Sequence, residues 1–495
     1  MTTTIDGGLA LEDLRFSNSF AHLPDDFYER RAPSGIPGAV LAAFNPDAAT
    51  LIGLRPGQET RDAFVRVASG NEILPGMEPV AAIYAGHQFG SFVPQLGDGR
   101  AILLGEVVNA RGESWELQLK GAGLTAFSRF GDGRAVLRST IREYLAGEAL
   151  HHLGIPSTRA LAMTASDEPV FRETSETAAV LVRMAPTFVR FGSFELFHYR
   201  GETAAVKLLA DYTIERWFPE AGTGDDRYER FFRSVVTRTA DLMAAWQTVG
   251  FAHGVMNTDN FSIIGLTLDY GPYGFLDAYE PGFICNHTDS GGRYAFDRQP
   301  TIGLWNCYAL ANALTSLIEK NALESSLATY EAAYHASFLR RMRRKLGLAL
   351  EYDDDAALVL HVLRLLEASH ADYTRFFRSL CDIDIESRPS DDLTAAMFAD
   401  RDGWYAWQAL YRTRLARETQ PAVARRDAKR AANPKYVLRN YLAQTAIERA
   451  QAGDFSEIER LHGVLRQPFA EQPENEACAA APPDWAKAIS VSCSS

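Results

Sequence analysis

Cysteine is scarce in this sequence. The chain has five cysteines in 495 residues, scattered along its second half: Cys285, Cys307, Cys381, Cys478 and Cys493. A secreted disulfide framework or a structural zinc cluster needs cysteines that are more numerous or more closely spaced. We therefore expect neither class of protein.

Long apolar runs and a surplus of basic residues are also missing. No stretch approaches the ~20 apolar residues of a membrane-spanning helix, and the first residues lack the basic start and apolar segment of a signal peptide. The net charge is −13 at pH 7, whereas nucleic-acid surfaces need clustered lysine and arginine. We expect a monomeric cytoplasmic protein whose partners are proteins or small molecules, with no nucleic acid and no membrane among them.

The hydrophobic content of 46% is enough for a large core. Turn-forming segments separate short apolar runs up to about residue 80, which predicts an ordered but irregular lead-in. Apolar runs of strand length are frequent from there to about residue 200, and helical periodicity dominates afterwards. We expect an α+β chain with four parts: a lead-in over 1–80, a strand-rich lobe over 81–200, a helical lobe over 201–470 and a flexible tail over 471–495.

Residues 253–271, HGVMNTDNFSIIGLTLDYG, have the pattern of a metal and phosphate loop. Kinase-like enzymes place H-G-D-x-x-x-x-N before a strand that ends in D-F-G, because nucleotide-bound Mg²⁺ needs hard oxygen ligands from two adjacent segments. Asn260 and Asp269 fall at the ligand positions, and a short buried strand is expected between them. Val255 stands where the base should be, and it cannot accept a proton.

Ordinary kinase chemistry is therefore in doubt. Asp259, directly before Asn260, is a carboxylate that could act as the base from another place on the same loop. The alternative is that the H-G and D-Y-G turns flank a core strand by chance.

A glycine-rich turn and a lysine frame a predicted hairpin upstream. Gly97-Asp98-Gly99 precedes the apolar run AILLGEVV, and a second run, WELQLK, ends in Lys120. This order is typical of a hairpin that covers phosphate groups, with backbone N–H groups at the glycines and a point charge at the lysine. Most G-x-G turns only begin a hairpin, so the simpler interpretation stays open.

Apolar residues recur at helical spacing over residues 135–153, which predicts a helix. Glu143 falls on its apolar face, where a carboxylate is costly unless it is paired. Lys120 is the predicted partner, as in kinase-like sites. The alternative is a solvated residue that pairs with Arg138 or Arg142.

Residues 178–197 predict a strand, a turn at Ala185-Pro186 and a second apolar stretch. Arg183 and Arg190 are embedded in this apolar sequence. Phosphate oxygens suit the planar guanidinium, and structural pairing with an acidic side chain is the alternative for each arginine.

Five blocks of the sequence together resemble the selenoprotein O family of protein adenylyltransferase pseudokinases. They reach from about residue 80 to the last residue and are QLGDGRAILLGE, LQLKGAGLTAFSRFGDGRAVLRSTIREYL, HGVMNTDNFSIIGLTLDYGPYGFLD, NPKYVLRNYLAQ and the terminal Cys493-Ser494-Ser495. The resemblance implies a protein-kinase-like two-lobed fold with an additional N-terminal segment and a helical C-terminal extension. It also implies ATP bound in a flipped orientation, so that AMP rather than phosphate is transferred to Ser, Thr or Tyr hydroxyls of proteins.

The resemblance also assigns roles to residues. Asp259 matches the proton acceptor of the family, and Asn260 and Asp269 match the ligands of Mg²⁺ or Mn²⁺. Glu143 matches the partner of the strand lysine. The positions that match nucleotide contacts are Gly97, Gly99, Arg100, Lys120, Asp132, Gly133, Arg183, Arg190 and Asp269.

Eukaryotic members of the family carry selenocysteine at the third position from the end, where this chain has Cys493. Cys285 lies shortly after the D-Y-G turn, in the region of a kinase activation loop. We expect a reversible regulatory disulfide between these two cysteines, and redox proteins as further partners. The alternatives are two unpaired thiols, or pairing with Cys478.

Two other functions remain open. An authentic kinase for a protein or small molecule is possible if Asp259 reaches the acceptor hydroxyl, although Val255 argues against it. A catalytically silent nucleotide-binding scaffold, signalling through its cysteine tail, is the second. No residue in these motifs reads the base, so UTP could replace ATP and donate UMP.

Overall fold

The computed structural model describes residues 7–386 and 393–491. Within these residues nine strands form one antiparallel sheet in the order β2-β4-β7-β8-β11-β10-β3, with β1 paired to β7 and β9 to β11. The strands of this sheet are β1 (Phe16–Ser17), β2 (Tyr28–Arg30), β3 (Val40–Phe44), β4 (Val80–Ala82), β7 (Ala101–Val108), β8 (Ser114–Lys120), β9 (Ala135–Val136), β10 (Arg159–Phe171) and β11 (Ser175–Ala185). Two small sheets pair β5 (Gly86–Gln88) with β6 (Ser91–Val93) and β12 (Phe251–Ala252) with β13 (Gly274–Phe275).

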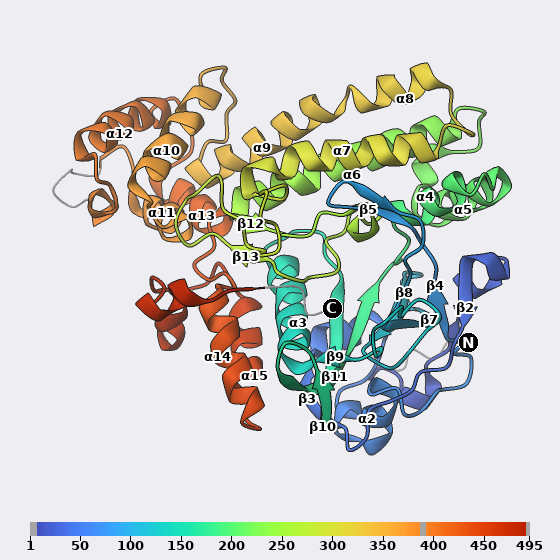
Figure 1. Ribbon diagram of the computed structural model, residues 1–495. Helices are drawn as coiled ribbons and strands as arrows, with labels where there is room; N and C mark the ends of the chain where they lie inside the picture. The colour runs from blue at the N-terminus through green and yellow to red at the C-terminus, as the bar shows by residue number, and fades with distance from the viewer. Residues whose placement is uncertain (1–6, 387–392, 492–495) are drawn as a thin grey trace.

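Helices make up most of the remaining structure, so the α+β prediction is confirmed at the level of a mixed α and β chain (Figure 1). The helices are α1 (Pro46–Leu51), α2 (Asp62–Ala68), α3 (Leu137–His152), α4 (Phe191–Tyr199), α5 (Thr203–Trp217), α6 (Arg227–Val249), α7 (Gln299–Ala313), α8 (Lys320–Leu327), α9 (Tyr330–Leu346), α10 (Asp355–Ser369), α11 (Tyr373–Ser379), α12 (Arg401–Leu415), α13 (Ala422–Ala432), α14 (Asn440–Gln451) and α15 (Ser456–Leu465).

The central strands are covered on both faces, and alternation along each strand decides which residue faces which layer. On β8, Leu117 and Leu119 pack into the apolar cluster that also contains residues of α2 and the first turns of the chain. Gln118 and Lys120 therefore point to the opposite face, on which α3 lies. On β11, Val182 packs into the same apolar cluster as Leu117 and Leu119, and Arg183 faces the same side as Lys120.

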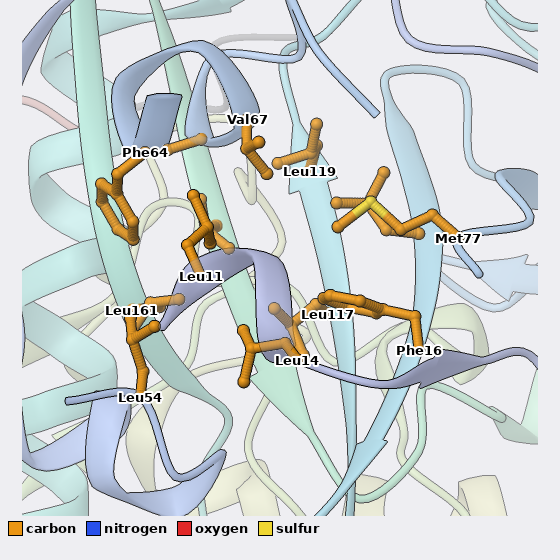
Figure 2. Close-up of a pocket in the computed structure, with 13 residues that line it drawn as sticks. Leu11, Leu14, Phe16, Leu54, Phe64, Val67, Met77, Leu117, Leu119 and Leu161 are labelled. Carbon is orange, nitrogen blue, oxygen red and sulfur yellow. The ribbon is translucent and has the colours of Figure 1, made fainter. Parts of the chain in front are cut away.

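Figure 2 shows a cavity in the apolar cluster, on the face away from Lys120. Its volume is about 20 Å³, little more than one water molecule needs. Its lining includes Leu11, Phe64, Met77 and Leu161. A cavity this small and apolar is a packing defect of the core rather than a nucleotide site.

The prediction of an irregular lead-in up to residue 80 is wrong. This segment contributes β1, β2, β3 and part of β4 to the main sheet, with β2 and β3 at its two edges. These strands are two to five residues long, too short for an alternating pattern to stand out among the turn residues.

The second apolar stretch after β11 is helical. Residues 191–199 form α4, which lies against α5 and α7 rather than in the sheet. Helix α6 then ends at Gly250, whose φ of +71° provides the left-handed residue that terminates the helix, and the chain enters β12.

The helices from α7 onward fall into three groups in Figure 1, of which α10 to α13 lie together beyond α9, and α10 to α12 share an apolar core. Helices α7 to α9 pack on α6, whereas α14 and α15 pack on α3, on the strand-rich side of the molecule. Within the described residues, no helix combines the length and the hydropathy that a bilayer-spanning helix needs.

The described part of the tail is packed on the body of the protein. It contains two short 3₁₀ helices, Pro473–Ala479 and Asp484–Ala488. The Tyr436 hydroxyl donates to the carbonyl of Gln472 at 3.0 Å, and the backbone N–H of His287 donates to the carbonyl of Val491 at 3.3 Å. The tail therefore returns to the segment that follows the D-Y-G turn.

Candidate active site

Lys120 lies at the end of β8, facing α3. Its Nζ is 2.6 Å from Glu143 Oε2 and 4.0 Å from Asp269 Oδ1. Burial, with Arg183 nearby, lowers the pKa of Lys120 to about 8, and the Glu143 carboxylate opposes this shift. Glu143 thus binds the cation that the sequence analysis paired with it.

The arginines that were the alternative partners of Glu143 bind elsewhere. Arg138 is bound to Glu176, and the Arg142 guanidinium donates to the carbonyl of Tyr273 at 2.7 Å and stacks on its ring.

Arg183 and Arg190 converge on Asp269. Arg183 Nη2 is 2.5 Å from Asp269 Oδ1, and Arg190 Nη1 binds Asp269 Oδ2. Arg183 also donates to Glu143 through Nε and to Gln118 Oε1 at 3.1 Å. Burial disfavours the charged form of Asp269, but the two guanidinium groups outweigh it and hold its pKa well below the usual range.

Asp98 is a further buried acid that the motif analysis left without a role. Its side chain turns inward from the glycine turn and accepts from Gln118 Nε2 at 3.1 Å and from the Tyr84 hydroxyl at 3.3 Å. Arg190 Nη2 lies 3.7 Å away, and its guanidinium covers the Tyr84 ring. Desolvation raises the pKa of Asp98. The signal available in the sequence was an acid between two glycines, just before a buried strand.

The loop after β12 is fixed by His253. Its Nε2 donates to the carbonyl of Leu268 at 2.9 Å, and its Nδ1 accepts from the N–H of Val255 at 3.4 Å. The ring is buried and stacked on Trp246, and burial lowers its pKa, so the neutral tautomer fits these bonds. His253 therefore ties the loop to the residue just before Asp269.

The predicted strand between Asn260 and Asp269 is wrong. Only isolated bridges occur there, between Ser262 and Arg190 and between Thr267 and Ser157. A turn at Gly265, with φ of +78°, interrupts the extended chain. Asp269 itself has φ of +57°, an unfavourable conformation for a residue with a side chain, of the kind that clusters at functional sites.

Asp259 is buried in the short 3₁₀ helix Thr258–Asn260. Arg190 Nη1 donates to its backbone carbonyl at 2.8 Å, which brings Asp259 and Asp269 to the same guanidinium. Its Oδ2 accepts from Gln88 Nε2 at 3.3 Å, and its Oδ1 is buried without a hydrogen-bond partner in the described part of the chain. Burial raises the pKa of Asp259 to about 7, opposed by Arg190 and Gln88.

The β5–β6 hairpin is the element of the site that the sequence analysis missed. Three consecutive hairpin residues contact the loop that carries Asp259. The His87 N–H donates to Thr258 Oγ1 at 2.7 Å, Gln88 binds Asp259, and the Phe89 N–H donates to Asn257 Oδ1 at 3.2 Å. In Figure 1 β5 reaches from the strand-rich part to helices α4 and α7. The sequence signal was the polar pair His87-Gln88 between two glycines.

The glycine turn before β7 packs against the loop that follows β8. A side chain at Gly97, where φ is +146°, would collide with the Phe127 ring, and one at Gly99 would meet the Phe127 carbonyl. Arg100 is half-buried, and desolvation lowers its pKa although Glu143 and Asp269 act in the opposite sense. Arg100 is therefore near the acidic centre of the site.

Asp132 and Gly133 lie on the loop between β8 and β9, outside the cluster around Asp269. Asp132 binds Arg172 at 2.8 and 2.9 Å, which lowers the pKa of Asp132. Gly133, with φ of +73°, abuts the backbone of Gly123.

Of the two cysteines of the expected disulfide, Cys285 lies within the described residues. Cys285 is buried against the catalytic loop, where its Sγ lies 3.5 Å from the carbonyl of Ala252. Cys493 lies outside the described residues. Cys478, the competing partner, is buried and accepts from Arg460 Nη1 at 3.3 Å.

Three cations, Lys120, Arg183 and Arg190, lie around Asp269 together with the carboxylates of Glu143, Asp98 and Asp259. With an amide oxygen at Asn260, this arrangement can hold a polyphosphate and accept a proton. Such a site suits a nucleotide-dependent transferase. The chain belongs to the family described as protein adenylyltransferase SelO, whose match covers residues 10–466.

Curated relatives agree with this assignment. The chain is 56% identical over 489 residues to protein nucleotidyltransferase YdiU of Myxococcus xanthus, 53% identical over 486 residues to that of Thiobacillus denitrificans, and 55% identical over 496 residues to that of Thioalkalivibrio sulfidiphilus. Each comparison covers 98% of this chain and 99% of the relative. The chain is therefore a protein nucleotidyltransferase.

Proposed function

We propose that this nucleotidyltransferase binds ATP in a flipped orientation between the two lobes of a kinase-like fold and transfers AMP to Ser, Thr or Tyr hydroxyls of proteins. The observation that carries the proposal is the placement of two buried arginines, Arg183 and Arg190, beside Lys120, combined with Val255 at the usual position of a kinase base. A γ-phosphate that points inward needs such cations, and an α-phosphate that points outward needs a different base.

The kinase-like interpretation rests on the order of elements. The β7–β8 hairpin would cover the nucleotide, α3 would supply Glu143, and the chain would cross to the helical lobe after β11. Residues 81–200 would then form most of one lobe and 201–470 most of the other, with the lead-in packed on the first lobe.

In the proposed reaction the acceptor oxygen attacks the α-phosphorus, and the bond from that phosphorus to the bridging oxygen of the β-phosphate breaks. Pyrophosphate leaves, and Asp259 takes the hydroxyl proton through its unpartnered Oδ1. Lys120, Arg183 and Arg190 would hold the β- and γ-phosphates, while Glu143 keeps Lys120 and Arg183 in place. Gly97, Gly99, Arg100, Asp132 and Gly133 are the further nucleotide contacts that we propose.

Asn260 and Asp269 are the residues that would hold a divalent cation, which would share the Asp269 carboxylate with Arg183 and Arg190. The Asn260 amide donates through Nδ2 to the carbonyl of Val255 at 3.0 Å, which leaves its oxygen as the ligand atom. One amide and one carboxylate oxygen are hard donors, suited to Mg²⁺ or Mn²⁺ whose other ligands come from phosphates and water. When bound, the ion would neutralise charge that develops at the phosphates.

Several finer properties complete the proposal. ATP is the expected co-substrate. UTP would compete with ATP, because we assign no residue to recognition of the nucleotide base. We also propose a monomer that works in the cytoplasm, exchanges electrons with redox proteins and is regulated by a Cys285–Cys493 disulfide. The return of the tail to His287 supports this pairing.

The test is incubation of the purified chain with Mg²⁺ or Mn²⁺ and ATP labelled at either the α- or the γ-phosphate. Retention of the α-label alone on protein is the expected result, and Asp259→Asn should abolish it. Retention of the γ-label alone would identify a kinase instead. If neither label is retained, a silent nucleotide-binding scaffold becomes the better interpretation.

A further inference from the structure

Arg293 carries a positive charge that no carboxylate neutralises in the described parts of the chain. No ion pair joins its guanidinium to an Asp or Glu in those parts, and the nearby Asp289 is bound instead to the backbone N–H groups of Arg293 and Tyr294. The guanidinium lies over the rings of Trp305 and Tyr294, with centroid distances of 4.8 and 5.8 Å. Its Nε is buried and has no hydrogen-bond partner among the residues that the structure describes.

The guanidinium lies flat against the tip of the β5–β6 hairpin. A Cβ at Gly90 would be 3.1 Å from Arg293 Cζ, a tight contact, and the φ of +85° at this position also favours glycine. The preceding residue, Phe89, has φ of +50° and is 42% exposed. Its N–H donates to the Tyr294 hydroxyl at 2.9 Å, which fixes the tip next to Arg293. We call Phe89, Gly90 and Arg293 the hairpin-tip surface.

This surface adjoins the carboxylate that we assign as the base. Gln88 binds Asp259, and Gly90, two residues further along, touches Arg293. Phe89 and Gly90 form the turn of the hairpin, so the separation of Gln88 and Gly90 is within the ~7 Å that two extended residues of a substrate span. An extended chain whose hydroxyl lies at Asp259 would thus bring the side chain about two positions away, on the same face, to Arg293.

We propose that the hairpin-tip surface binds the acceptor segment of the protein substrate and that Arg293 recognises an Asp or Glu about two residues from the acceptor hydroxyl. A carboxylate of the substrate would supply the charged partner that the Arg293 guanidinium lacks within the described residues. The partly exposed Phe89 ring would pack on apolar atoms of the same substrate segment. This inference rests on the proposed role of Asp259.

The probes are synthetic peptides with a single hydroxyl, supplied by Ser, Thr or Tyr, and with Asp, Asn or Lys two residues before or after it. Transfer of the α-label from ATP gives kcat/KM for each peptide. We expect the Asp peptides to exceed the Asn peptides about 3- to 10-fold, with the Lys peptides lowest, as for a partly buried charge-assisted contact. The preference should vanish in Arg293→Met and reverse in Arg293→Glu, with the KM for ATP unchanged.

Arg298→Met is the matched control, because Arg298 is exposed on the same segment and should keep the wild-type preference. The inference is overturned if wild-type enzyme labels all three peptides equally, or if both Arg293 variants keep the wild-type ranking. A raised KM for ATP with an unchanged ranking also overturns it and assigns Arg293 to the nucleotide. Loss of transfer to every peptide and to the enzyme itself would instead refute the proposed function, and this inference with it.

Discussion

Gln88 and Asp259 are 171 residues apart in the sequence, yet Gln88 Nε2 donates to Asp259 Oδ2 at 3.3 Å. Gly86, in the same strand as Gln88, makes this contact possible, because a Cβ there would be 2.6 Å from Asp259 Oδ1. The hairpin thus holds the carboxylate by one oxygen and leaves the other for a proton. An element outside the catalytic loop orients its acid.

Replacing Gln88 by Leu should lower the turnover of nucleotidyl transfer about 10-fold, the range for a lost hydrogen bond to a charged group. The KM for ATP should change little, because the hydrogen bond of Gln88 goes to the proposed base and not to a phosphate ligand. Initial rates at varied ATP separate the two effects.

Ser91→Ala is the control for this change, since Ser91 is exposed and pairs with Gln88 across the hairpin. It should leave both parameters unchanged. A raised KM with wild-type turnover in Gln88→Leu would contradict the orienting role.

Glu143 holds two cations at once, Lys120 and Arg183, while only 3% exposed. Glu143→Gln removes the charge that both share and leaves Asp269 as their remaining carboxylate partner in the described residues. We expect a loss of roughly 3 kcal/mol of stability, in the range for breaking one partner of a buried ion pair, and weaker binding of ATP. Urea unfolding and calorimetric titration measure the two quantities.

The exchange of Glu176 for Gln provides a matched comparison, because Glu176 binds Arg138 on the same helix, α3, and Arg138 is 28% exposed. Its cost should be smaller than that of Glu143→Gln, because it releases one partly exposed cation instead of two more buried ones, with ATP affinity intact. Equal costs for the two variants would show that the Glu143 network adds nothing beyond an ordinary ion pair.

Glu116 gives the chain a predictable dependence on pH. Burial, reinforced by Glu106 directly opposite on β7, raises the pKa of Glu116 to about 8. The unfolded chain ionises this group near pH 4.5, so the folded state holds one more proton between these values. By linkage, the contribution of Glu116 to stability is complete below pH 4.5 and is lost as the pH rises to 8.

In the wild-type chain the Phe188 N–H donates to Glu116 Oε2 at 2.9 Å. Glu116→Gln keeps an oxygen that can accept this hydrogen bond and removes the charge. The variant should therefore gain stability over wild type as the pH rises from 5 to 8, by at least about 1 kcal/mol at pH 8. Thermal unfolding across this range measures the difference. The exposed Glu173, changed to Gln, should show no such trend.

Local patterns in the sequence predicted those parts of the fold that depend on local spacing. The hairpin that ends at Lys120, helix α3 and the position of Glu143 follow from alternation and helical periodicity. Short edge strands such as β2 and β3 carry too few residues for such a pattern. The stretch after Ala185 is mostly apolar, and periodicity alone does not distinguish a buried helix from a strand.

The residues of the candidate site also fall into those that local spacing predicts and those that only the fold brings together. Asn260 and Asp269 were found because their spacing in the chain is short, and the chemistry of metal binding fixes it. Gln88 and Arg293 lie 171 and 34 residues from Asp259 in the sequence. Only the folded chain brings Gln88 to Asp259 and Arg293 to the tip of the same hairpin. Asp98 was visible as a charge, but its burial against Arg190 depends on the sheet register.

The predicted Cys285–Cys493 disulfide depends on two short chain segments, residues 285–287 and 491–493. The carbonyl of Val491 accepts from His287, so each segment needs to span only two residues, about 7 Å, from this bond to Cys285 or Cys493. In oxidised glutathione, we expect the two thiols to give up two electrons and two protons and to form one disulfide, while glutathione disulfide is reduced to two thiols.

Alkylation before and after reduction, read by peptide mass, measures this bond. Cys285 and Cys493 should be protected together in the oxidised chain, and Cys493→Ser should expose Cys285 to reagent after unfolding. Cys478→Ser should leave the protection intact, because Cys478 is buried against Arg460. Equal alkylation of both thiols in the oxidised and reduced chains would refute the pairing, whereas loss of protection in Cys478→Ser would assign the bond to Cys478. Since Cys285 packs on the catalytic loop at Ala252, a disulfide there would tie the tail to that loop, and transfer of the α-label should differ between the two redox states.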